Sequence, residues 1–449
     1  MRTKVCIIGA GPAGLMAAIF SAEAGSLTTV IEVNTSAGRK LLLTGAGRCN
    51  ITHQAEPAEI VREFGVKGKF LSFCLYQYPP QFVQDFFTGL GLRLKIEKDG
   101  CVFPVGDRAS DVRDVLMERA KKLGVRCLYG RHVKSIVKEN EAFIVHTAKE
   151  PVYAEKLIIA TGGLSWPKTG SIGDGYRFAR QFGHSIVGPR ASLVPLVTRE
   201  DWPKQLAGTA VEDVRVTARI NNKKITTAGA IIFTDDGIGG PAVLNMSRHL
   251  ADYLPARQGE LVSAKTCRAV AGGIARLGVG ASRSTAVALT GRKPVCISLD
   301  LVPQVSDAEL EREIAELIAE NPKRKVVNIL AEFVPRRFSA ILCRQASCGD
   351  EFAASQLKKD VRKKLVRLLK ALPLSVVNTR PIEEAVVTHG GVSVTEIKPK
   401  TMESKVCPGL FFAGEVIDVD GPCGGYNLQM CWSTGALAGY SAAKTTDDR

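Results

Sequence analysis

The chain has 449 residues, 45% of them hydrophobic and 23% charged, with a formal net charge of +15 and a pI of about 9.3. The length predicts two or three folded domains, and the ordinary hydrophobic and charged content excludes a disordered chain. The positive net charge attracts anions, from nucleic acid to small acidic molecules. No stretch of roughly 18 apolar residues occurs, so we expect no membrane span. The apolar run at the N-terminus is only a few residues long and ends in glycines, so we expect a buried strand there and not a signal peptide, and we expect a cytoplasmic protein. The 12 cysteines form no CxxC pair, so no metal site is expected.

Strands and helices alternate in the first third of the chain. Residues 5–8 and 28–32 predict buried strands on either side of a helix at residues 15–23, which together make a parallel βαβ unit. Amphipathic helices are expected over residues 82–91 and 111–123. Further strands are expected over residues 133–137, 142–147 and 156–160. This alternation is typical of a Rossmann-type α/β domain.

The pattern changes after Pro189. Apolar and polar side chains alternate, as in β-strands, over residues 193–198, 211–220 and 224–233. These strands predict a separate sheet or small barrel. A helical, basic segment follows, and strands with glycine turns then return. We therefore predict an α/β fold in which an inserted β-barrel-like domain with a helical segment interrupts the Rossmann-type domain. The expected limits are residues 1–190 and 386–449 for the first domain, 191–305 and 373–385 for the β-rich insert, and 306–372 for the helical basic segment.

A glycine-rich turn joins the first strand to the first helix. Gly9, Gly11 and Gly14 follow the GxGxxG spacing, in which the first glycine allows the tight turn, the second lets a pyrophosphate approach the backbone and the third allows close helix packing. The helix N-terminus adds free N–H groups. Glu32, at the end of the second strand, is placed to accept hydrogen bonds from ribose hydroxyls. These residues predict a dinucleotide site, against the alternative of a chance glycine turn.

Two further glycine-rich segments suggest that this dinucleotide is FAD. Residues 38–50 carry three basic side chains among glycines, as expected for a loop around a charged cofactor, although a solvated basic loop is the alternative. Near the other end, a strand at residues 410–412 enters a glycine turn, and N–H groups at the start of a helix expected over residues 430–443 can hold the flavin pyrimidine oxygens. No second GxGxxG follows a strand, so we expect NAD(P)H only as a transient electron donor.

Residues 9–14, 38–50, 161–163, 170–176 and 414–429 together resemble the motifs of a family of two-dinucleotide-binding-domain flavoproteins with an inserted β-barrel and helical domain. That family includes bacterial bile-acid enone reductases and the flavoprotein class of ribosomal RNA dihydrouridine synthases. The resemblance spans nearly the whole chain and implies a Rossmann-type FAD-binding domain. By this resemblance the cofactor-binding residues are Gly9, Gly11, Pro12, Ala13, Gly14, Glu32, Arg39, Lys40, Gly47, Arg48, Cys49, Asn50, Thr161, Gly162, Gly163, Gly414, Glu415, Gly425, Tyr426, Asn427 and Gln429.

Two positions depart from the family pattern. Cys101 stands where the family usually has an arginine, and Asp235 follows Thr234 where the family tends to have a histidine. Both lie outside the FAD motifs, so they leave the cofactor expectation intact and leave the substrate open.

Reduction of an activated C=C bond needs a hydride from flavin N5 and a proton donor. Cys49 is the catalytic candidate because it lies beside an arginine in a loop expected to touch the cofactor, although a small packing residue is the favoured alternative. Cys423 and Cys431 flank the second flavin loop and are similar or weaker candidates. We expect Tyr426 to stack on or hydrogen-bond the cofactor, and His389 to be a structural histidine near the flavin.

The helical segment concentrates positive charge. Between residues 322 and 370, 13 lysines and arginines stand against four acidic residues. Lys359, Arg362, Lys363 and Arg367 have the spacing of one helical face, which can neutralise several phosphates. They are therefore RNA-binding candidates, and a solvated surface is the alternative.

These patterns predict an FAD-dependent oxidoreductase, driven by NAD(P)H, that delivers hydride to an activated C=C bond. Uridine in ribosomal RNA, converted to dihydrouridine, is the favoured substrate because of the basic segment and the family resemblance. A small anionic enone, such as a bile-acid derivative, is the alternative substrate. An alternative of another class is a flavin-containing RNA-binding or redox-sensing protein with little turnover. The sequence leaves the oligomeric state open.

Overall fold

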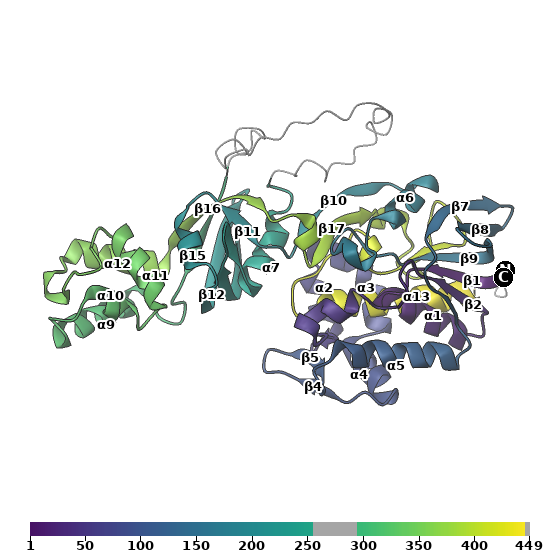
Figure 1. Ribbon diagram of the computed structural model, residues 1–449, viewed down its shortest axis with the longest axis horizontal. Coiled ribbons are helices and arrows are strands. Elements are labelled where there is room, and N and C mark those ends of the chain that lie inside the picture. Colours follow the sequence, from purple (N-terminus) through teal and green to yellow (C-terminus); the bar gives the residue numbers. More distant parts are fainter. Residues whose placement is uncertain (255–293, 445–449) are drawn as a thin grey trace, which may run out of the picture. The chain divides into compact units, whose positions relative to one another are not determined.

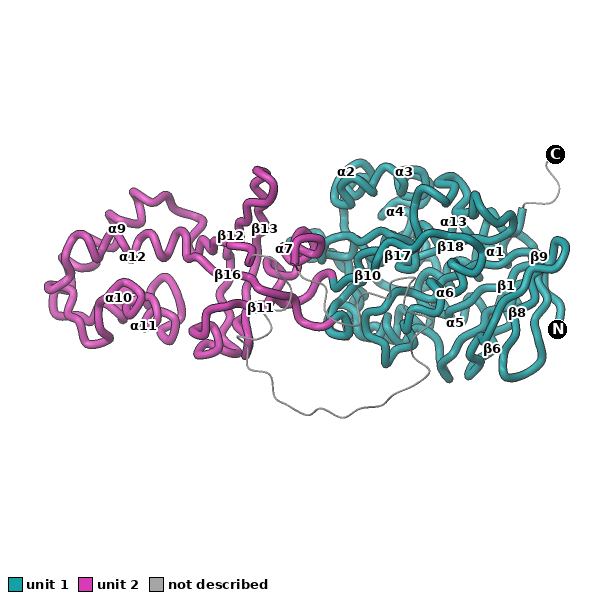
Figure 2. Tube along the Cα trace, turned by 90° about the horizontal axis from the view of Figure 1, so that it is seen from above, with its two compact units in different colours: residues 1–191, 382–449 teal, residues 192–381 magenta. Residues whose placement is uncertain are grey.

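The computed structural model describes residues 1–254 and 294–444. The chain forms two compact units, which Figure 2 distinguishes by colour. Unit 1 consists of Met1–Ala191 and Ile382–Arg449, and unit 2 of Ser192–Pro381. Unit 2 is therefore an insertion, since the chain leaves unit 1 and later returns to complete it.

Unit 1 is built on a seven-stranded sheet with the order β6-β2-β1-β9-β8-β7, to which β18 adds beside β9 (Figure 1). Its strands are β1 (Arg2–Ile8), β2 (Thr28–Ile31), β6 (Arg126–Leu128), β7 (Val133–Glu139), β8 (Ala142–Thr147), β9 (Val152–Ile159) and β18 (Leu410–Phe412). All the pairs are parallel except β7–β8 and β8–β9. Ile8, Ile159 and Phe412 lie in register, so the loops that follow β1, β9 and β18 leave the sheet side by side.

Unit 1 also contains α-helices. They are α1 (Pro12–Glu23), α2 (Pro57–Glu63), α3 (Gly68–Gln77), α4 (Pro80–Gly89), α5 (Ala109–Lys122), α6 (Asp174–Gln181) and α13 (Tyr426–Lys444). Helix α13 starts four residues before the expected position 430, directly after a glycine turn. A Cβ built on Gly435 or Gly439 lies 2.4 Å from the Ala13 oxygen or 2.1 Å from the Ala17 oxygen, so both glycines are needed for the approach of α13 to α1. None of the described helices combines the length and the hydropathy needed to span a bilayer.

Two small sheets complete unit 1. The first is antiparallel, in the order β3-β5-β4, with β3 (Thr52–His53), β4 (Leu94–Ile96) and β5 (Cys101–Pro104). The second pairs β10 (Ile186–Ser192) with β17 (Val387–Val392). Strand β17 thereby follows the return of the chain to unit 1 and brings residues 387–392 beside the end of its first part.

Unit 2 contains a closed antiparallel barrel with the order β11-β14-β13-β12-β15-β16. Its strands are β11 (Leu196–Thr198), β12 (Ala210–Ile220), β13 (Lys223–Phe233), β14 (Gly237–Gly239), β15 (Val295–Asp300) and β16 (Leu372–Thr379), and α7 (Pro241–Leu250) follows β14. The barrel-like insert in an α/β protein is confirmed. The strand expected at 193–198 begins only at Leu196, because Leu193 has a φ of 53° that a strand does not accommodate.

A helical module is inserted between β15 and β16 of the barrel (Figure 1). It consists of α9 (Asp307–Glu320), α10 (Val326–Leu330), α11 (Arg336–Gln345) and α12 (Lys359–Lys370). Helix α9 starts at a capping box in which Ser306 and Glu309 satisfy each other's backbone N–H groups. Leu310 of α9 and Leu365 of α12 are fully buried, so these two helices share the module's core.

Candidate active site

In the turn after β1, backbone atoms pack against two of the three glycines, and the third faces open space. A Cβ built on Gly9, whose φ is 102°, lies 2.5 Å from the Ala160 oxygen, and a Cβ on Gly14 lies 1.9 Å from the Gly9 oxygen. A Cβ on Gly11 meets no atom within 4 Å. Packing therefore requires Gly9 and Gly14 to be glycine, whereas the backbone at Gly11 faces open space that a ligand can enter.

Helix α1 begins at this opening. Gly11 is its N-cap and Pro12 its first residue, and its first turn has neither a side-chain cap nor an acidic residue. Leu15 donates to the Gly11 carbonyl at 2.9 Å, whereas Ala13 and Gly14 lie before the first residue with an intrahelical acceptor. Their N–H groups and the positive end of the helix dipole make this turn a cradle for an anion such as a pyrophosphate.

Glu32 follows β2, and its carboxylate is fixed against the glycine turn. Its Oε2 accepts the Ala10 N–H at 2.7 Å, and its Oε1 accepts the Asn34 backbone N–H at 2.9 Å and side-chain Nδ2 at 2.7 Å. Glu32 is only 7% exposed. The structure thus brings Glu32 to the glycine turn, where the carboxylate also holds the backbone at Ala10.

A polar cluster joins the 38–50 loop to the segments that follow β9 and β18. Lys40 Nζ donates to Glu415 Oε2 and to Ser165 Oγ, both at 2.6 Å. Ser165 Oγ and the Thr388 N–H donate to Glu415 Oε1 at 2.8 and 2.9 Å. The sequence pointed to Lys40 and Glu415 but not to Ser165 and Thr388, whose only local signal is a hydroxyl residue close to paired glycines.

The two arginines of the 38–50 loop bind protein groups. Arg39 Nη1 donates to Asn34 Oδ1 at 2.7 Å. The Arg48 guanidinium carbon lies 3.9 Å from the centre of the Phe103 ring, and its Nη1 lies 2.7 Å from Glu97 Oε1. Arg48 is therefore held on the β4–β5 hairpin by stacking and by an ion pair.

Cys49 is completely buried, whereas the neighbouring Gly47 is exposed. Burial raises the pKa of the Cys49 thiol to about 12, against a small opposing effect of a hydrogen bond with Thr44. Since no atom of Cys49 is open to the surface, its thiol cannot touch a substrate in this conformation. The structure therefore favours the packing role of Cys49 over that of a catalytic acid.

Two polar side chains at the start of α13 are used inside the protein. Gln429 has no exposed surface; its Oε1 accepts the Thr52 hydroxyl at 2.6 Å, and its Nε2 donates to the Tyr78 carbonyl at 2.8 Å. Asn427 accepts the Gly421 N–H at 2.8 Å and donates to the Gly421 carbonyl at 2.9 Å. The Gln429 side chain is therefore not presented to a cofactor, and Asn427 shapes the turn that precedes α13.

That turn packs against the segment that begins at Asn50. Gly425 has a φ of 93°, and a Cβ built on it lies 2.5 Å from the Thr52 oxygen and 2.9 Å from Asn50 Oδ1. Tyr426 stacks on His53 with 4.9 Å between ring centroids, and burial raises the pKa of its hydroxyl to about 12. The structure thus brings Asn50, Gly425 and Tyr426 together at the N-terminus of α13.

The turns after β9 and β18 approach each other closely. Gly162 and Gly414 have φ values of 73° and 74°, and a Cβ built on Gly163 lies 3.1 Å from Glu415 Oε1 and 2.3 Å from Thr388 Oγ1 of β17. The Thr161 hydroxyl oxygen is buried without a hydrogen-bond partner among the described residues. An unsatisfied buried hydroxyl is uncommon and typical of a site where a further group or an ordered water belongs.

The two positions that depart from the family pattern lie in different units. Cys101 of β5 is 7% exposed, its Sγ donates to Asp99 Oδ2 at 3.2 Å, and burial raises the pKa of its thiol to about 12. This position therefore carries a neutral thiol instead of the cation usual in the family. Asp235 is exposed in the turn between β13 and β14.

The basic face expected on α12 is exposed at three of its four positions. Lys359, Lys363 and Arg367 are exposed and have no ion-pair partner within residues 1–254 and 294–444. Arg362 instead faces α9, where its Nη2 lies 3.8 Å from Glu311 Oε1 and its side chain is 24% exposed. Arg362 does not belong to the exposed face, because it lies on the side of α12 that packs against α9.

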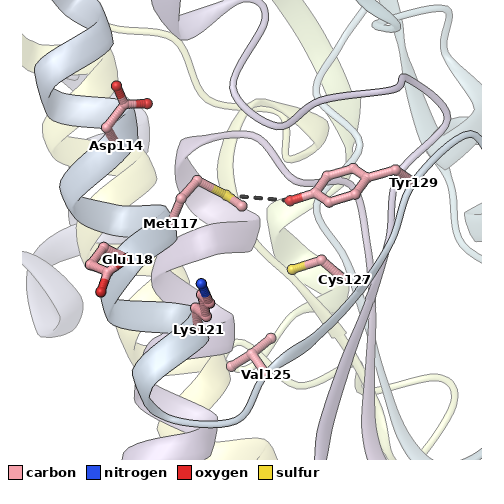
Figure 3. Close-up of a pocket in the computed structure, with 7 residues that line it drawn as sticks. All are labelled: Asp114, Met117, Glu118, Lys121, Val125, Cys127 and Tyr129. Atoms are coloured by element: carbon pink, nitrogen blue, oxygen red, sulfur yellow. Dashed lines mark hydrogen bonds between the residues drawn. The ribbon is translucent and has the colours of Figure 1, made fainter.

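A cavity of about 330 Å³ lies between α5 and the edge strand β6 (Figure 3). The Tyr129 hydroxyl donates to the Met117 sulfur across it at 3.4 Å. The residues that line it are Asp114, Met117, Glu118, Lys121, Val125, Cys127 and Tyr129. None of them was expected at the cofactor, although β6 also contacts Glu32, whose N–H donates to the Leu128 carbonyl at 3.0 Å. Within the described part of the chain, no group of three or more His, Cys, Asp or Glu residues is arranged to hold a metal ion.

Comparison with known proteins adds relatives that match the chain from end to end. The family model described as HI0933-like protein Rossmann domain matches residues 3–441. The 3-dehydro-bile acid delta(4,6)-reductase of Clostridium scindens is 28% identical over 444 residues, which cover 98% of this chain and 99% of the relative. The ribosomal RNA dihydrouridine synthase of Escherichia coli is 30% identical over 437 residues, 96% of each chain, and that of Haemophilus influenzae is 29% identical over 445 residues, 98% of each.

These matches confirm the family that the sequence motifs indicated. They cover both units of the structure, since residues 3–441 include the inserted barrel and the helical module. The three relatives are named as enzymes, one a reductase and two dihydrouridine synthases. The chain therefore belongs to the HI0933-like Rossmann family and is an oxidoreductase.

Proposed function

We propose that this protein is an FAD-dependent reductase that adds a hydride and a proton to an activated C=C bond, and that its substrate is uridine in ribosomal RNA. The cofactor assignment is carried by the glycine turn. Backbone atoms occupy the space that a Cβ on Gly9 or Gly14 would need, whereas Gly11 faces open space. The Glu32 carboxylate is fixed at the same turn. An FAD pyrophosphate and ribose fit this arrangement, because the first needs free N–H groups and the second an acceptor.

Each end of the cofactor has residues suited to it. Ala13 and Gly14 would hold the pyrophosphate, and Glu32 the adenosine ribose. The turn at Gly425 and the first N–H groups of α13 would hold the flavin pyrimidine oxygens, with Lys40 nearby as a cation. When bound, the flavin supplies the hydride that the C=C bond receives. NAD(P)H is the electron donor in this proposal, and it visits transiently because the chain carries a single glycine fingerprint.

The choice of ribosomal RNA is supported by the exposed face of α12. Lys359, Lys363 and Arg367 form a row of cations without acidic partners within the described residues. Such a row neutralises successive phosphates, which a compact anionic enone does not offer. Relatives named for the two kinds of substrate are 28% and 30% identical to this chain, so similarity alone does not choose between them.

A small anionic enone such as a bile-acid derivative is the second candidate, because the Clostridium scindens relative named as a bile-acid reductase spans 98% of the chain. Its acid group would be attracted by the net charge of +15. The exposed cations of α12 would then serve only for solubility.

The test is mass-spectrometric mapping of dihydrouridine in ribosomal RNA from cells with and without the gene. We expect one modified uridine to disappear on deletion and to return with the intact gene, but not with a Gly14→Val variant that cannot form the glycine turn. In parallel, the purified flavoprotein is offered ribosomal RNA or a conjugated steroid enone with NADPH. An unchanged RNA profile together with turnover of the enone would replace the RNA proposal by the second candidate.

A further inference from the structure

A histidine–carboxylate pair lies on the strand that borders the candidate flavin site. His389 belongs to β17, directly after Thr388, which donates to Glu415 in the polar cluster with Lys40. The next two residues fix this strand: a Cβ on Gly390 would lie 2.7 Å from the Gly188 oxygen, and a Cβ on Gly391 2.7 Å from the Val416 oxygen. His389 is therefore held next to the 414–420 segment, one residue from the cluster that the cofactor proposal uses.

Asp420 orients the His389 ring. His389 Nδ1 lies 2.8 Å from Asp420 Oδ1, and the side chains are 16% and 3% exposed. The carboxylate is thus almost entirely covered while part of the imidazole reaches the surface. A buried carboxylate on one ring nitrogen fixes the tautomer and the direction of the other, which is the arrangement that histidine acids and bases use.

The other ionisable groups around this loop are unsuited to giving up a proton near neutral pH. Burial raises the pKa of Tyr426 to about 12 and that of Cys423 to about 11. Asp418 is already engaged in an ion pair with Lys67. The His389–Asp420 pair is therefore the acid–base candidate of this loop.

We propose that His389 donates the proton in the reduction and that Asp420 is the positioning residue that holds it. This inference rests on the proposed function. The π bond of the substrate C=C breaks. One carbon takes the hydride that the flavin supplies, and the other uses the π electron pair to take a proton from the His389 imidazolium. The resulting neutral imidazole regains a proton from water, so one hydride and one proton enter the substrate and the ring is unchanged.

The test compares His389→Gln with a matched control, His132→Gln. His132 also pairs with a carboxylate, Asp174, at 2.8 Å in the same unit, but its side chain is 49% exposed and His132 is not among the residues expected to bind the cofactor. Stopped-flow measurements separate the two halves of the reaction, using as acceptor whichever of ribosomal RNA or a steroid enone the wild-type protein reduces. We expect flavin content and reduction by NADPH to be unchanged in both variants. Reoxidation by the acceptor should slow by a factor of about 10² to 10⁴ in His389→Gln alone, with little change in KM.

Two further readouts exclude a merely structural role. Added imidazole should restore part of the reoxidation rate to His389→Ala and should leave the normal rate of a His132→Ala control unchanged. In ¹⁵N NMR spectra, the ring signals of His389 should shift in Asp420→Asn while those of His132 stay in place, and this readout needs no turnover. Normal reoxidation in a fully flavinylated His389→Gln protein would overturn the inference and leave the proposed function intact. A wild-type protein that contains flavin but reduces neither acceptor would count against the proposed function itself, and unmoved NMR signals in Asp420→Asn would remove Asp420 from its role.

Discussion

The glycine turn of unit 1 and the exposed face of α12 in unit 2 are both built by repeating one kind of residue, but they depend on different physics. In the turn, a Cβ on Gly14 would lie 1.9 Å from a backbone oxygen, so the residue type is fixed by contact. On α12, Lys359 and Lys363 touch no acidic partner within the described residues, so their contribution is charge alone.

This difference predicts how each region responds to change. Close-packed backbone cannot relax around an extra methyl group, so one substitution should abolish the turn, and salt should not matter. Exposed cations act through an electrostatic field that salt screens, so each should contribute a small, roughly additive and salt-dependent amount to the free energy of RNA binding. The following experiments test that contrast, beginning with the largest expected effect.

Gly14→Ala should be the most damaging single substitution. Alanine normally favours a helix over glycine by about 1 kcal/mol, so any loss must come from the clash with the Gly9 carbonyl. We expect destabilisation of about 3 kcal/mol or more, together with loss of bound flavin. Thermal unfolding and the flavin-to-protein absorbance ratio measure both effects.

Gly11→Ala is the matched control for that experiment. Its Cβ would meet no atom within 4 Å, so the melting temperature should fall only slightly, by the preference of the N-cap of α1 for glycine over alanine. The variant should nevertheless bind flavin more weakly, because the methyl group enters the space proposed for the pyrophosphate. If both variants kept full flavin content, the cofactor would have to lie elsewhere.

Lys40→Met tests the polar cluster, where packing and charge act together. The Lys40 and Glu415 side chains are 20% and 12% exposed, and among the described residues the carboxylate would keep Ser165 and Thr388 as donors. We expect a loss of about 2 kcal/mol in the free energy of unfolding, less than for a fully buried pair because both groups keep some solvent. Urea denaturation of Lys40→Met, Glu415→Gln and the double variant measures it. A double variant whose loss equals the sum of the single losses would show that the two side chains are not coupled.

The glycine turn and the Lys40–Glu415 pair also show what local sequence can and cannot predict. Gly9, Gly14 and Glu32 lie within 24 residues, so spacing alone indicated the turn that the structure contains. The Lys40–Glu415 pair joins positions 375 residues apart, and no local pattern couples them. Ser165 and Thr388 were missed for the same reason, because a lone hydroxyl residue carries no periodic or motif signal.

Burial is the other property that the sequence did not reveal. Cys49 and Gln429 stand inside the glycine-rich motifs, yet the structure places both in the core with no exposed surface. Arg362 has the helical spacing of the basic face but turns toward Glu311 of α9, a helix that contributes six acidic residues between positions 306 and 321. In each case a tertiary neighbour decided the outcome, whereas spacing describes only one element at a time.

Replacing Lys359, Lys363 and Arg367 together by alanine tests the charged side of the comparison. If these residues contact phosphates, the slope of log Kd against log salt for a ribosomal RNA fragment should fall by about 2 to 3. Melting temperature and flavin content should not change, because the three side chains are exposed. The control removes equal charge from unit 1 with Lys121→Ala, Lys122→Ala and Lys149→Ala. Equal slopes for the two triple variants would mean that α12 contributes only to the general field.

The smallest effect concerns the pH dependence of stability, to which a buried imidazole in unit 1 should contribute. His184 of unit 1 is 3% exposed, and burial lowers the pKa of its ring, against the opposing effect of Glu396 at 3.2 Å. Because the folded state then binds the proton less readily than the unfolded chain, acidification through the region just below the ordinary histidine pKa of about 6.5 should lower stability. His184→Gln should remove this contribution and flatten the decline in the free energy of unfolding between pH 7 and pH 5. A steeper decline in His184→Gln would show instead that the attraction of Glu396 outweighs the burial of the ring.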